Sequence, residues 1–404
     1  MTMRFSSIWV TSFVGCLLPC ACLADACIDL DPDRFWNRDE LYRAPAWRTN
    51  PFPESDYPGM RAMLVKGKGL PNESGEFFAY FATPEGKAPT GGWPAVLIVH
   101  GAGGTAYPNV VEEWLKEGFA VMALDWYNQR PAPGLTNVAP SEVTVPRVDL
   151  PGGKHGYEHL VNVANIVTAH SLLRSLPDVN SKRTCLAGLS WGSWYATVAG
   201  AVDDRFCGVI SIYIADRRPF AVPDPKRQEF VMGPFHKAFK NPVWWIVWPP
   251  DGNYICSSMQ TGWEVCPKDA GRTIVHNLGH SHEGFGVAAV KRMAKYFTGT
   301  APRLPLLSLG SCKDGVARAE ILDPGKGVDH ALLWCYDRLP DYGWAKNKDL
   351  AGYSVPAEII GCEVRAKVPA KAKLCYLSVY EKEQPDKRRN VMCGSSGYFE
   401  VNGK

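Results

Sequence analysis

Short apolar runs alternate with amphipathic stretches between residues 95 and 297. The amphipathic stretches have helical spacing: in 108–117, for example, Pro108 stands at the start, apolar positions share one face and Gly118 follows the end. The alternation predicts an α/β fold with a mostly parallel, doubly wound sheet and helices on both of its faces. The predicted strands lie at residues 95–99, 119–124, 184–187, 207–213, 243–248 and 272–275.

The helical rhythm stops after Gly299. Beyond it, short β-like runs at 358–364, 374–379 and 398–401 are separated by Gly and Pro, which predicts a small β-sandwich-like domain. Extended segments also precede the α/β region, and we expect residues 76–81 to form an antiparallel strand at the sheet edge. The predicted organisation is a signal peptide at 1–24, an α/β domain with an N-terminal lead-in at 25–300, and a β-rich C-terminal domain at 301–404.

Two segments interrupt the α/β alternation with many Pro, Gly and aromatic residues. Residues 126–156 and 215–241 are both longer than a crossover between strands requires. We expect them to shape a pocket above the strand ends, the alternative being surface decoration.

The N-terminus has the outline of a signal peptide. Arg4 precedes an apolar stretch at 8–18, and small residues allow cleavage before Asp25 or before Cys27. We therefore expect a secreted or periplasmic protein. A membrane anchor is the alternative, but the stretch is short and no basic stop-transfer cluster follows. A lipoprotein form would carry its acyl group on Cys16, Cys20, Cys22 or Cys27. No later apolar run is long enough to span a membrane.

Cysteine usage fits export. Of thirteen cysteines, three fall in the signal peptide, which leaves an even number for disulfides. Cys256 and Cys266 lie in one short polar loop, and we predict a bridge between them worth at most roughly 3 kcal/mol. A structural zinc site is the competing interpretation, but the chain has no Cys-x-x-Cys pair.

The overall charge disfavours polyanionic partners. With 44 basic and 41 acidic residues, the formal net charge is only +3. This balance predicts no binding of nucleic acid or anionic membranes and points to a small or uncharged partner.

Candidate chemistry begins with the pentapeptide Gly-Leu-Ser-Trp-Gly at 188–192. It follows a predicted strand and precedes a helix-compatible segment, as in a nucleophile elbow, where Ser190 would occupy a strained corner between small residues. The pattern Gly-x-Ser-x-Gly also occurs by chance in chains of this length, so it needs support from other residues. A serine nucleophile further needs a base, an acid and oxyanion donors at strand ends.

Oxyanion donors are expected from the Gly-rich turn at 100–104. A backbone N–H of Gly101, Ala102 or Gly103 would join the N–H of Trp191, and losing one such donor typically costs about 3 kcal/mol of barrier. The alternative is a plain glycine turn, and His100 is expected to be a structural hydrogen-bonding residue.

The acid and the base are expected after the last two strands of the α/β region. Asp251 follows the strand at 243–248, with Asp216 and Asp224 as rivals. Two histidines compete for the base. We predict His282, because His-Glu-Gly-Phe directly adjoins the final helix, with His280 as a supporting or alternate base. A metal site on these two histidines lacks a third ligand, so neither a metal nor another cofactor is expected.

Taken together, these motifs resemble the α/β-hydrolase superfamily, and within it the secreted acetylxylan-esterase and dienelactone-hydrolase-like branch. The resemblance covers roughly residues 60–300 and implies the α/β-hydrolase fold with a Ser-Asp-His triad. Ala102, Ser193 and Pro250 depart from residues common in that group. The motifs that carry the resemblance lie at residues 100–106, 169–177, 188–192, 250–254 and 279–282.

The predicted function is that of a secreted serine carboxylic ester hydrolase that works through an acyl-enzyme and removes small acyl groups, such as acetyl, from a carbohydrate. Its partner would be a small-molecule or polysaccharide ester. The alternatives are a lactone or polymer-ester hydrolase, a peptidase of the same fold, or a catalytically silent binding protein. An aromatic pocket for the sugar or acyl group, or simply core packing, would account for Trp126, Tyr127, Trp191, Tyr213 and Tyr254.

Overall fold

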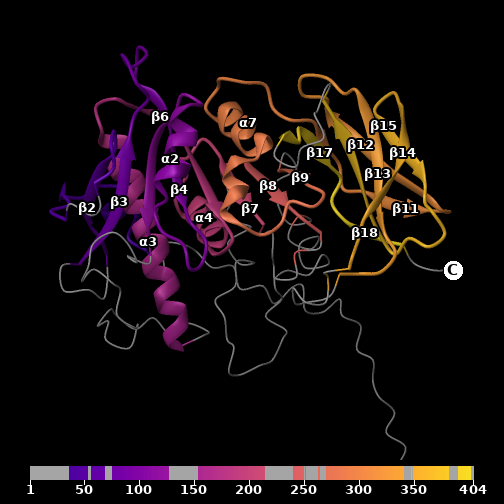
Figure 1. Ribbon diagram of the computed structural model, residues 1–404, viewed down its shortest axis with the longest axis horizontal. Helices are drawn as coiled ribbons and strands as arrows, with labels where there is room; N and C mark the ends of the chain where they lie inside the picture. Colours follow the sequence, from indigo (N-terminus) through magenta and orange to yellow (C-terminus); the bar gives the residue numbers. More distant parts are fainter. Residues whose placement is uncertain are drawn as a thin grey trace, which may run out of the picture.

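In the residues that it describes, the computed structural model of the chain contains two sheets (Figure 1). It describes residues 36–52, 56–68, 75–126, 153–213, 240–249, 251, 263, 270–340, 347, 349–381 and 390–401. The predicted signal peptide, Cys256, Cys266, Asp216, Asp224, Tyr127, Tyr254 and most of the two Pro-rich segments lie outside these residues. No helix in the described parts is long and apolar enough to cross a membrane.

Within these residues, the first sheet has nine strands in the order β1-β2-β3-β5-β4-β6-β7-β8-β9. Neighbouring strands from β5 to β9 are parallel, whereas β1, β2 and β3 add an antiparallel edge. All six strands predicted in the α/β region are present, and so is the antiparallel strand expected at 76–81. The strands are β1 (Trp47–Thr49), β2 (Arg61–Lys66), β3 (Glu76–Ala82), β4 (Trp93–Val99), β5 (Ala120–Asp125), β6 (Val179–Leu189), β7 (Val209–Ile212), β8 (Val243–Val247) and β9 (Gly271–Ile274).

Helices lie on both faces of this sheet. The crossover from β4 to β5 runs in the opposite direction to the crossover from β5 to β6, so right-handed connections place α2 and α3 on opposite faces. Helix α4 packs beside α3, and α7 is linked by ion pairs from Lys291 and Lys295 to Glu117, in the turn that follows α2. The helices are α1 (Arg38–Leu41), α2 (Pro108–Leu115), α3 (Gly153–Ser175), α4 (Trp191–Val202), the short 3-10 helix η5 (His282–Gly286) and α7 (Ala288–Phe297).

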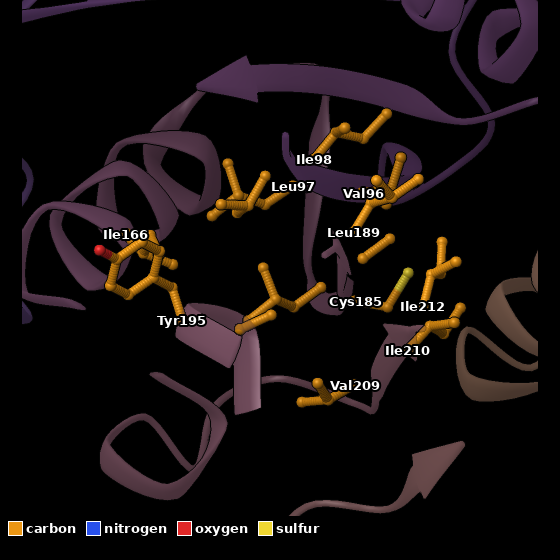
Figure 2. Packing of buried hydrophobic residues seen from close by; sticks show 14 of the residues in the cluster. Val96, Leu97, Ile98, Ile166, Cys185, Leu189, Tyr195, Val209, Ile210 and Ile212 are labelled. Atoms are coloured by element: carbon orange, nitrogen blue, oxygen red, sulfur yellow. The ribbon is translucent and has the colours of Figure 1, made fainter. Parts of the chain in front are cut away.

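The core lies between these helices and the central strands. Because β4 and the second half of β6, residues 185–189, are covered on both faces, they carry runs of non-polar residues rather than alternating polar and apolar ones. Figure 2 shows side chains of β4, β6 and β7 together with residues from α3 and α4; those labelled include Val96, Leu97, Ile98, Ile166, Leu189 and Tyr195.

The second sheet is antiparallel and lies C-terminal to α7 (Figure 1). It curls so that its end strands β10 and β17 contact each other, around a second apolar cluster. The run at 358–364 was predicted as one strand, and this is wrong: Gly361, with φ +60°, turns the chain between β14 and β15. The strands are β10 (Leu306–Leu307), β11 (Ser311–Lys313), β12 (Val316–Asp323), β13 (His330–Tyr336), β14 (Tyr353–Ile360), β15 (Glu363–Lys367), β16 (Leu374–Tyr380), β17 (Cys393–Ser395) and β18 (Phe399–Glu400).

The two sheets meet at β9, the edge strand of the first sheet. The Ile274 N–H donates to Ser395 Oγ at 3.0 Å, and Thr273 Oγ1 donates to the Cys393 carbonyl at 2.6 Å. Beyond the end of β9, the ring of His276 stacks on Trp334 of β13 at a centroid distance of 4.2 Å. The β-rich part therefore covers the edge strand from which the chain continues to His280.

Seven cysteines fall in the described parts of the chain, and none of them is in a disulfide. They are Cys185, Cys207, Cys312, Cys335, Cys362, Cys375 and Cys393.

Candidate active site

Ser190 occupies a strained corner between β6 and α4. Its φ of 55° and ψ of −124° lie outside the regions that L residues prefer, which costs about 1–3 kcal/mol and is typical of functional positions. The glycines predicted to give it room do so. A Cβ on Gly188 would lie 2.2 Å from the Gly192 carbonyl oxygen, and a Cβ on Gly192 would lie 2.2 Å from the His100 carbonyl oxygen. Both oxygens are backbone atoms and cannot rotate away as a side chain can. Any residue with a Cβ at position 188 or 192 would therefore force the backbone around Ser190 to shift.

Three side chains form a chain of hydrogen bonds at this corner. His280 Nε2 lies 2.8 Å from Ser190 Oγ, and His280 Nδ1 lies 2.6 Å from Asp251 Oδ2. Asp251 is fully buried, whereas the His280 side chain is 14% exposed. A neutral imidazole satisfies both contacts if Nδ1–H donates to the carboxylate and Nε2 accepts from the serine hydroxyl. This arrangement can remove a proton from Ser190 as its oxygen attacks.

The prediction of His282 as the base is wrong, because the structure places His280 in that position. The ring of His282 packs against Tyr107 at a centroid distance of 4.5 Å, and its Nε2 is buried without a hydrogen-bond partner among the described residues. That atom lies close to the Gly-rich turn, since a Cβ on Gly104 would be 2.7 Å from it. Burial, together with the charges of His100 and His280, lowers the pKa of His282 to about 4. His282 therefore stands beside the turn as a neutral ring.

Tyr213 holds the loop that carries His280. It follows β7 with a φ of 78°, and its ring stacks on His280 at a centroid distance of 4.4 Å. Its hydroxyl donates to the Ser281 carbonyl at 2.9 Å. The tyrosine thus contacts the face of the imidazole and anchors the next residue in the chain.

We expect Tyr213→Phe to lower kcat by about tenfold, the effect of one lost hydrogen bond on the position of His280. The ring remains and keeps its stacking contact, so KM and the thermal midpoint should stay close to those of the parent. Steady-state kinetics on an acetyl ester measure this. An unchanged kcat would show that the hydroxyl does not orient the loop, and Tyr296→Phe, away from the site, is the matched control.

The Gly-rich turn after β4 lies against Ser190. A Cβ on Gly101 would be 3.0 Å from Ser190 Cβ, and the Gly104 N–H donates to the Gly101 carbonyl at 3.1 Å to close the turn. Ala102 and Gly103 are exposed at its tip. Trp191 is the first residue of α4, where helix N–H groups point away from the helix. The structure thus brings together the segments from which we expect oxyanion donors.

Sequence reasoning missed the polar cluster that supports this turn. The His100 ring lies between the Gly101 carbonyl oxygen, 2.7 Å from Nδ1, and Asp125 Oδ1, 3.2 Å from Nε2. Thr105 Oγ1 donates to the other oxygen of Asp125 at 2.6 Å. His100 was expected to be structural, but its carboxylate partner is the last residue of β5 and has no motif of its own. Only the parallel pairing of β4 with β5 brings the two together.

The aromatic residues expected to line a pocket differ in exposure. Trp126 is buried, stacks on His100 and donates from Nε1 to the His100 carbonyl at 2.8 Å. Tyr213 is buried as well. Trp191 is 36% exposed, so among the described members of this group it is the one that offers an aromatic surface next to Ser190.

No group of three or more His, Cys, Asp or Glu side chains within the described residues is arranged to hold a metal ion.

Comparison with known proteins places this geometry in a fold family. The chain is similar to the acetyl xylan esterase from Paenibacillus sp. R4, with 17% identity, coverage of 69% of this chain and 99% of that one, and a TM-score of 0.50. The chain has the α/β-hydrolase fold. Residues 77–228 match the model of the dienelactone hydrolase family, which supports a hydrolase. No curated protein matches the chain.

Two further solved structures match the chain. Acetyl xylan esterase 1 from Thermoanaerobacterium sp. JW/SL YS485 is 16% identical, with coverage of 70% of this chain and 98% of that one and a TM-score of 0.45. Dienelactone hydrolase from Anabaena variabilis ATCC 29413 is 18% identical, with coverage of 59% and 97% and a TM-score of 0.40.

Proposed function

We propose that this α/β-hydrolase is a serine hydrolase of carboxylic esters that works through an acyl-enzyme. The observation that carries the proposal is the continuous hydrogen-bond chain from Ser190 through His280 to buried Asp251, with the serine at a strained elbow. The match of residues 77–228 to a hydrolase family supports the same chemistry. Because this series of hydrogen bonds is complete, it also argues against a catalytically silent protein on a hydrolase fold.

The proposed reaction has two halves. In the first, Ser190 Oγ attacks the ester carbonyl while His280 Nε2 takes its proton, and Asp251 stabilises the imidazolium that forms. The Trp191 N–H and an N–H from Gly101, Ala102 or Gly103 would bind the oxyanion. Collapse of the tetrahedral species breaks the ester bond as His280 gives its proton to the leaving alcohol. In the second half, water repeats the sequence on the acyl-enzyme and frees Ser190.

We propose an acetylated carbohydrate as the substrate. The likeness to an enzyme described as an acetyl xylan esterase supports it, as does the exposed face of Trp191 beside Ser190, because indole rings stack well on sugars. A lactone is the second candidate, favoured by the dienelactone hydrolase match. It is a cyclic ester and needs the same three side chains. The basic and apolar segments near the N-terminus, Arg4 and 8–18, support export from the cytoplasm.

Covalent labelling tests the mechanism directly. A fluorophosphonate should label the full chain once, on the peptide that contains Ser190, and abolish release of acetate from an acetyl ester. Ser190→Ala should carry no label, whereas Ser193→Ala, in the first turn of the same helix, should still be labelled. A label on another residue, or ester hydrolysis that persists in Ser190→Ala, would contradict the serine mechanism.

The substrate class is tested by comparing rates on three esters. Acetylated xylo-oligosaccharides should be cleaved with a higher kcat/KM than a long-chain acyl ester or a five-membered lactone. A higher kcat/KM on the lactone would favour a lactone as the substrate instead. A higher kcat/KM on the long-chain ester would exclude both the acetylated carbohydrate and the lactone.

A further inference from the structure

Two buried cysteines face each other in the C-terminal sheet, far from the proposed triad in the sequence. Cys335 lies in β13 and Cys375 in β16, and the two are direct partners in the antiparallel register. Their sulfur atoms are 3.5 Å apart. Neither side chain is exposed, and both belong to the apolar cluster of this sheet.

The ladder geometry suits a covalent bond between them. Directly opposed residues of an antiparallel pair have Cα atoms about 4.5–5.5 Å apart, inside the range of about 4.4–6.8 Å found for disulfides. The sulfurs would need to approach by only about 1.5 Å to reach the bonding distance of about 2.05 Å, which side-chain rotation provides.

The surroundings favour Cys335 as the first thiol to react. A hydrogen bond from the Cys375 thiol lowers the pKa of Cys335, and the charge of Lys371 acts in the same direction. The same contact and burial raise the pKa of Cys375. The thiolate is the nucleophile of thiol–disulfide exchange, so an asymmetric pair of this kind has a defined order of attack.

We propose that Cys335 and Cys375 form a cross-strand disulfide that joins β13 to β16. The oxidant is a disulfide compound, such as oxidised glutathione. The Cys335 thiolate attacks one of its sulfurs and releases one thiol, and Cys375 then loses its proton and attacks the mixed disulfide at Cys335, releasing the second thiol. The protein loses two hydrogens and the oxidant gains them. Because both cysteines are buried in the complete sheet, exchange takes place after β13 and β16 have paired, when Cys375 already contacts Cys335, and before the rest of the sheet covers them.

The disulfide would stiffen the strands that support the interface with the first sheet. Trp334 precedes Cys335 in β13 and stacks on His276, and Tyr376 follows Cys375 in β16 and stacks on Trp334 with a centroid distance of 6.3 Å. The bond would thus lie one residue away from both aromatic rings of this contact. It is independent of the proposed hydrolase activity.

Peptide mapping of the full chain tests the bond. The protein is refolded with oxidised glutathione, denatured, alkylated with N-ethylmaleimide without a reductant, and digested with trypsin. We expect fragments 327–338 and 374–382, which contain Cys335 and Cys375, to appear as one linked species lighter by two hydrogens than the separate peptides. Alkylation of both cysteines would overturn the proposal, and so would a link from either one to fragment 304–313, which contains Cys312.

Thermal unfolding gives a second readout. In the oxidised protein we expect the midpoint of the β-rich part to fall by about 5 °C or more when a phosphine reductant is added. The double variant Cys335→Ala/Cys375→Ala should not respond to the reductant, whereas Cys362→Ala, at an exposed turn, should respond like the parent. An equal response in the double variant would show that another bond is responsible. If the double variant does not fold, the peptide map of the parent still decides.

Discussion

Replacing His280 by alanine is expected to lower kcat on an acetyl ester by about 10⁴- to 10⁶-fold, with little change in KM. Among the hydrogen bonds of the described residues, the only one that joins a nitrogen atom to Ser190 Oγ comes from His280 Nε2, at 2.8 Å. The other ring nitrogen, Nδ1, is hydrogen-bonded to Asp251. Without the imidazole the serine has no base, and the leaving alcohol has no proton donor. Steady-state kinetics with 4-nitrophenyl acetate measure the loss. Addition of Ser190→Ala to this variant should lower kcat no further, because residues that act as a unit are not additive.

His282→Ala is the matched comparison, two residues along the same loop. We expect kcat to stay within about tenfold of the parent, because this ring contacts Tyr107 and the Gly-rich turn rather than Ser190. Its pKa of about 4 keeps it neutral above about pH 5, so the variant should retain the pH profile of kcat/KM. An equal collapse of kcat in both variants, or a displaced acid limb in His282→Ala, would contradict the assignment of His280.

The choice between these histidines could not be made from the sequence, because it depends on backbone direction over four residues. Asn277 and Gly279 both have positive φ, 55° and 74°, and together they turn the chain after β9 so that His280 points to Ser190. Tyr213, from a distant strand end, fixes that orientation. A rule based on adjacency to the final helix selects the residue at the start of η5 instead. The presence of Asn and Gly before the first histidine was the only local signal.

The central sheet was easier to predict, because burial on both faces leaves continuous apolar runs in the sequence. The runs at 95–99 and 243–248 match β4 and β8 to within two residues at either end. β6 is longer than predicted. It begins at Val179, but residues 180–183 are polar and partly exposed, so hydrophobicity marked only its buried second half. Patterning therefore identifies the part of a strand that lies in the core and misses the part that extends beyond it.

Polar networks in the interior are the part of the structure that motifs did not reveal. His170 of α3 and Asp203 at the end of α4 are both buried, with His170 Nδ1 2.7 Å from Asp203 Oδ2. The other ring nitrogen of His170 lies 2.8 Å from Thr184 Oγ1 of β6. Residues from three elements meet here, and each one alone looks like an ordinary polar residue in its own segment. Their spacing of 33 and 14 residues carries no recognisable pattern.

Asp203 is the charged centre of this network. Arg205 donates to it from Nε at 2.8 Å and from Nη2 at 2.7 Å, and the Arg205 guanidinium also lies 3.5 Å from the centroid of the Tyr42 ring. Burial alone would raise the pKa of Asp203, but His170 and Arg205 outweigh it and hold that pKa well below its usual range. Burial lowers the pKa of His170 even so, which leaves a neutral ring that donates from Nδ1 to the carboxylate.

We expect Asp203→Asn to lower the free energy of unfolding at pH 7 by about 3–5 kcal/mol, because it leaves the partly buried Arg205 without its counter-charge. The amide also presents a donor where two donors, from His170 and Arg205, already converge. Asp204→Asn is the control, since Asp204 is exposed and neighbours the same helix end. Urea unfolding of the three proteins measures the difference. A loss no larger than that of Asp204→Asn would show that the buried charge does not stabilise the fold.

The pH dependence of that difference has a definite sign. A carboxylate with a depressed folded-state pKa stabilises the folded state fully above its unfolded pKa of about 3.9, and this contribution is lost as the pH falls toward the folded value. The gap between the parent and Asp203→Asn should therefore be constant from about pH 5 to pH 8 and shrink below about pH 4. A gap that widened in acid would mean that Asp203 takes up its proton more readily in the folded protein than in the unfolded chain, and that Arg205 does not hold it ionised.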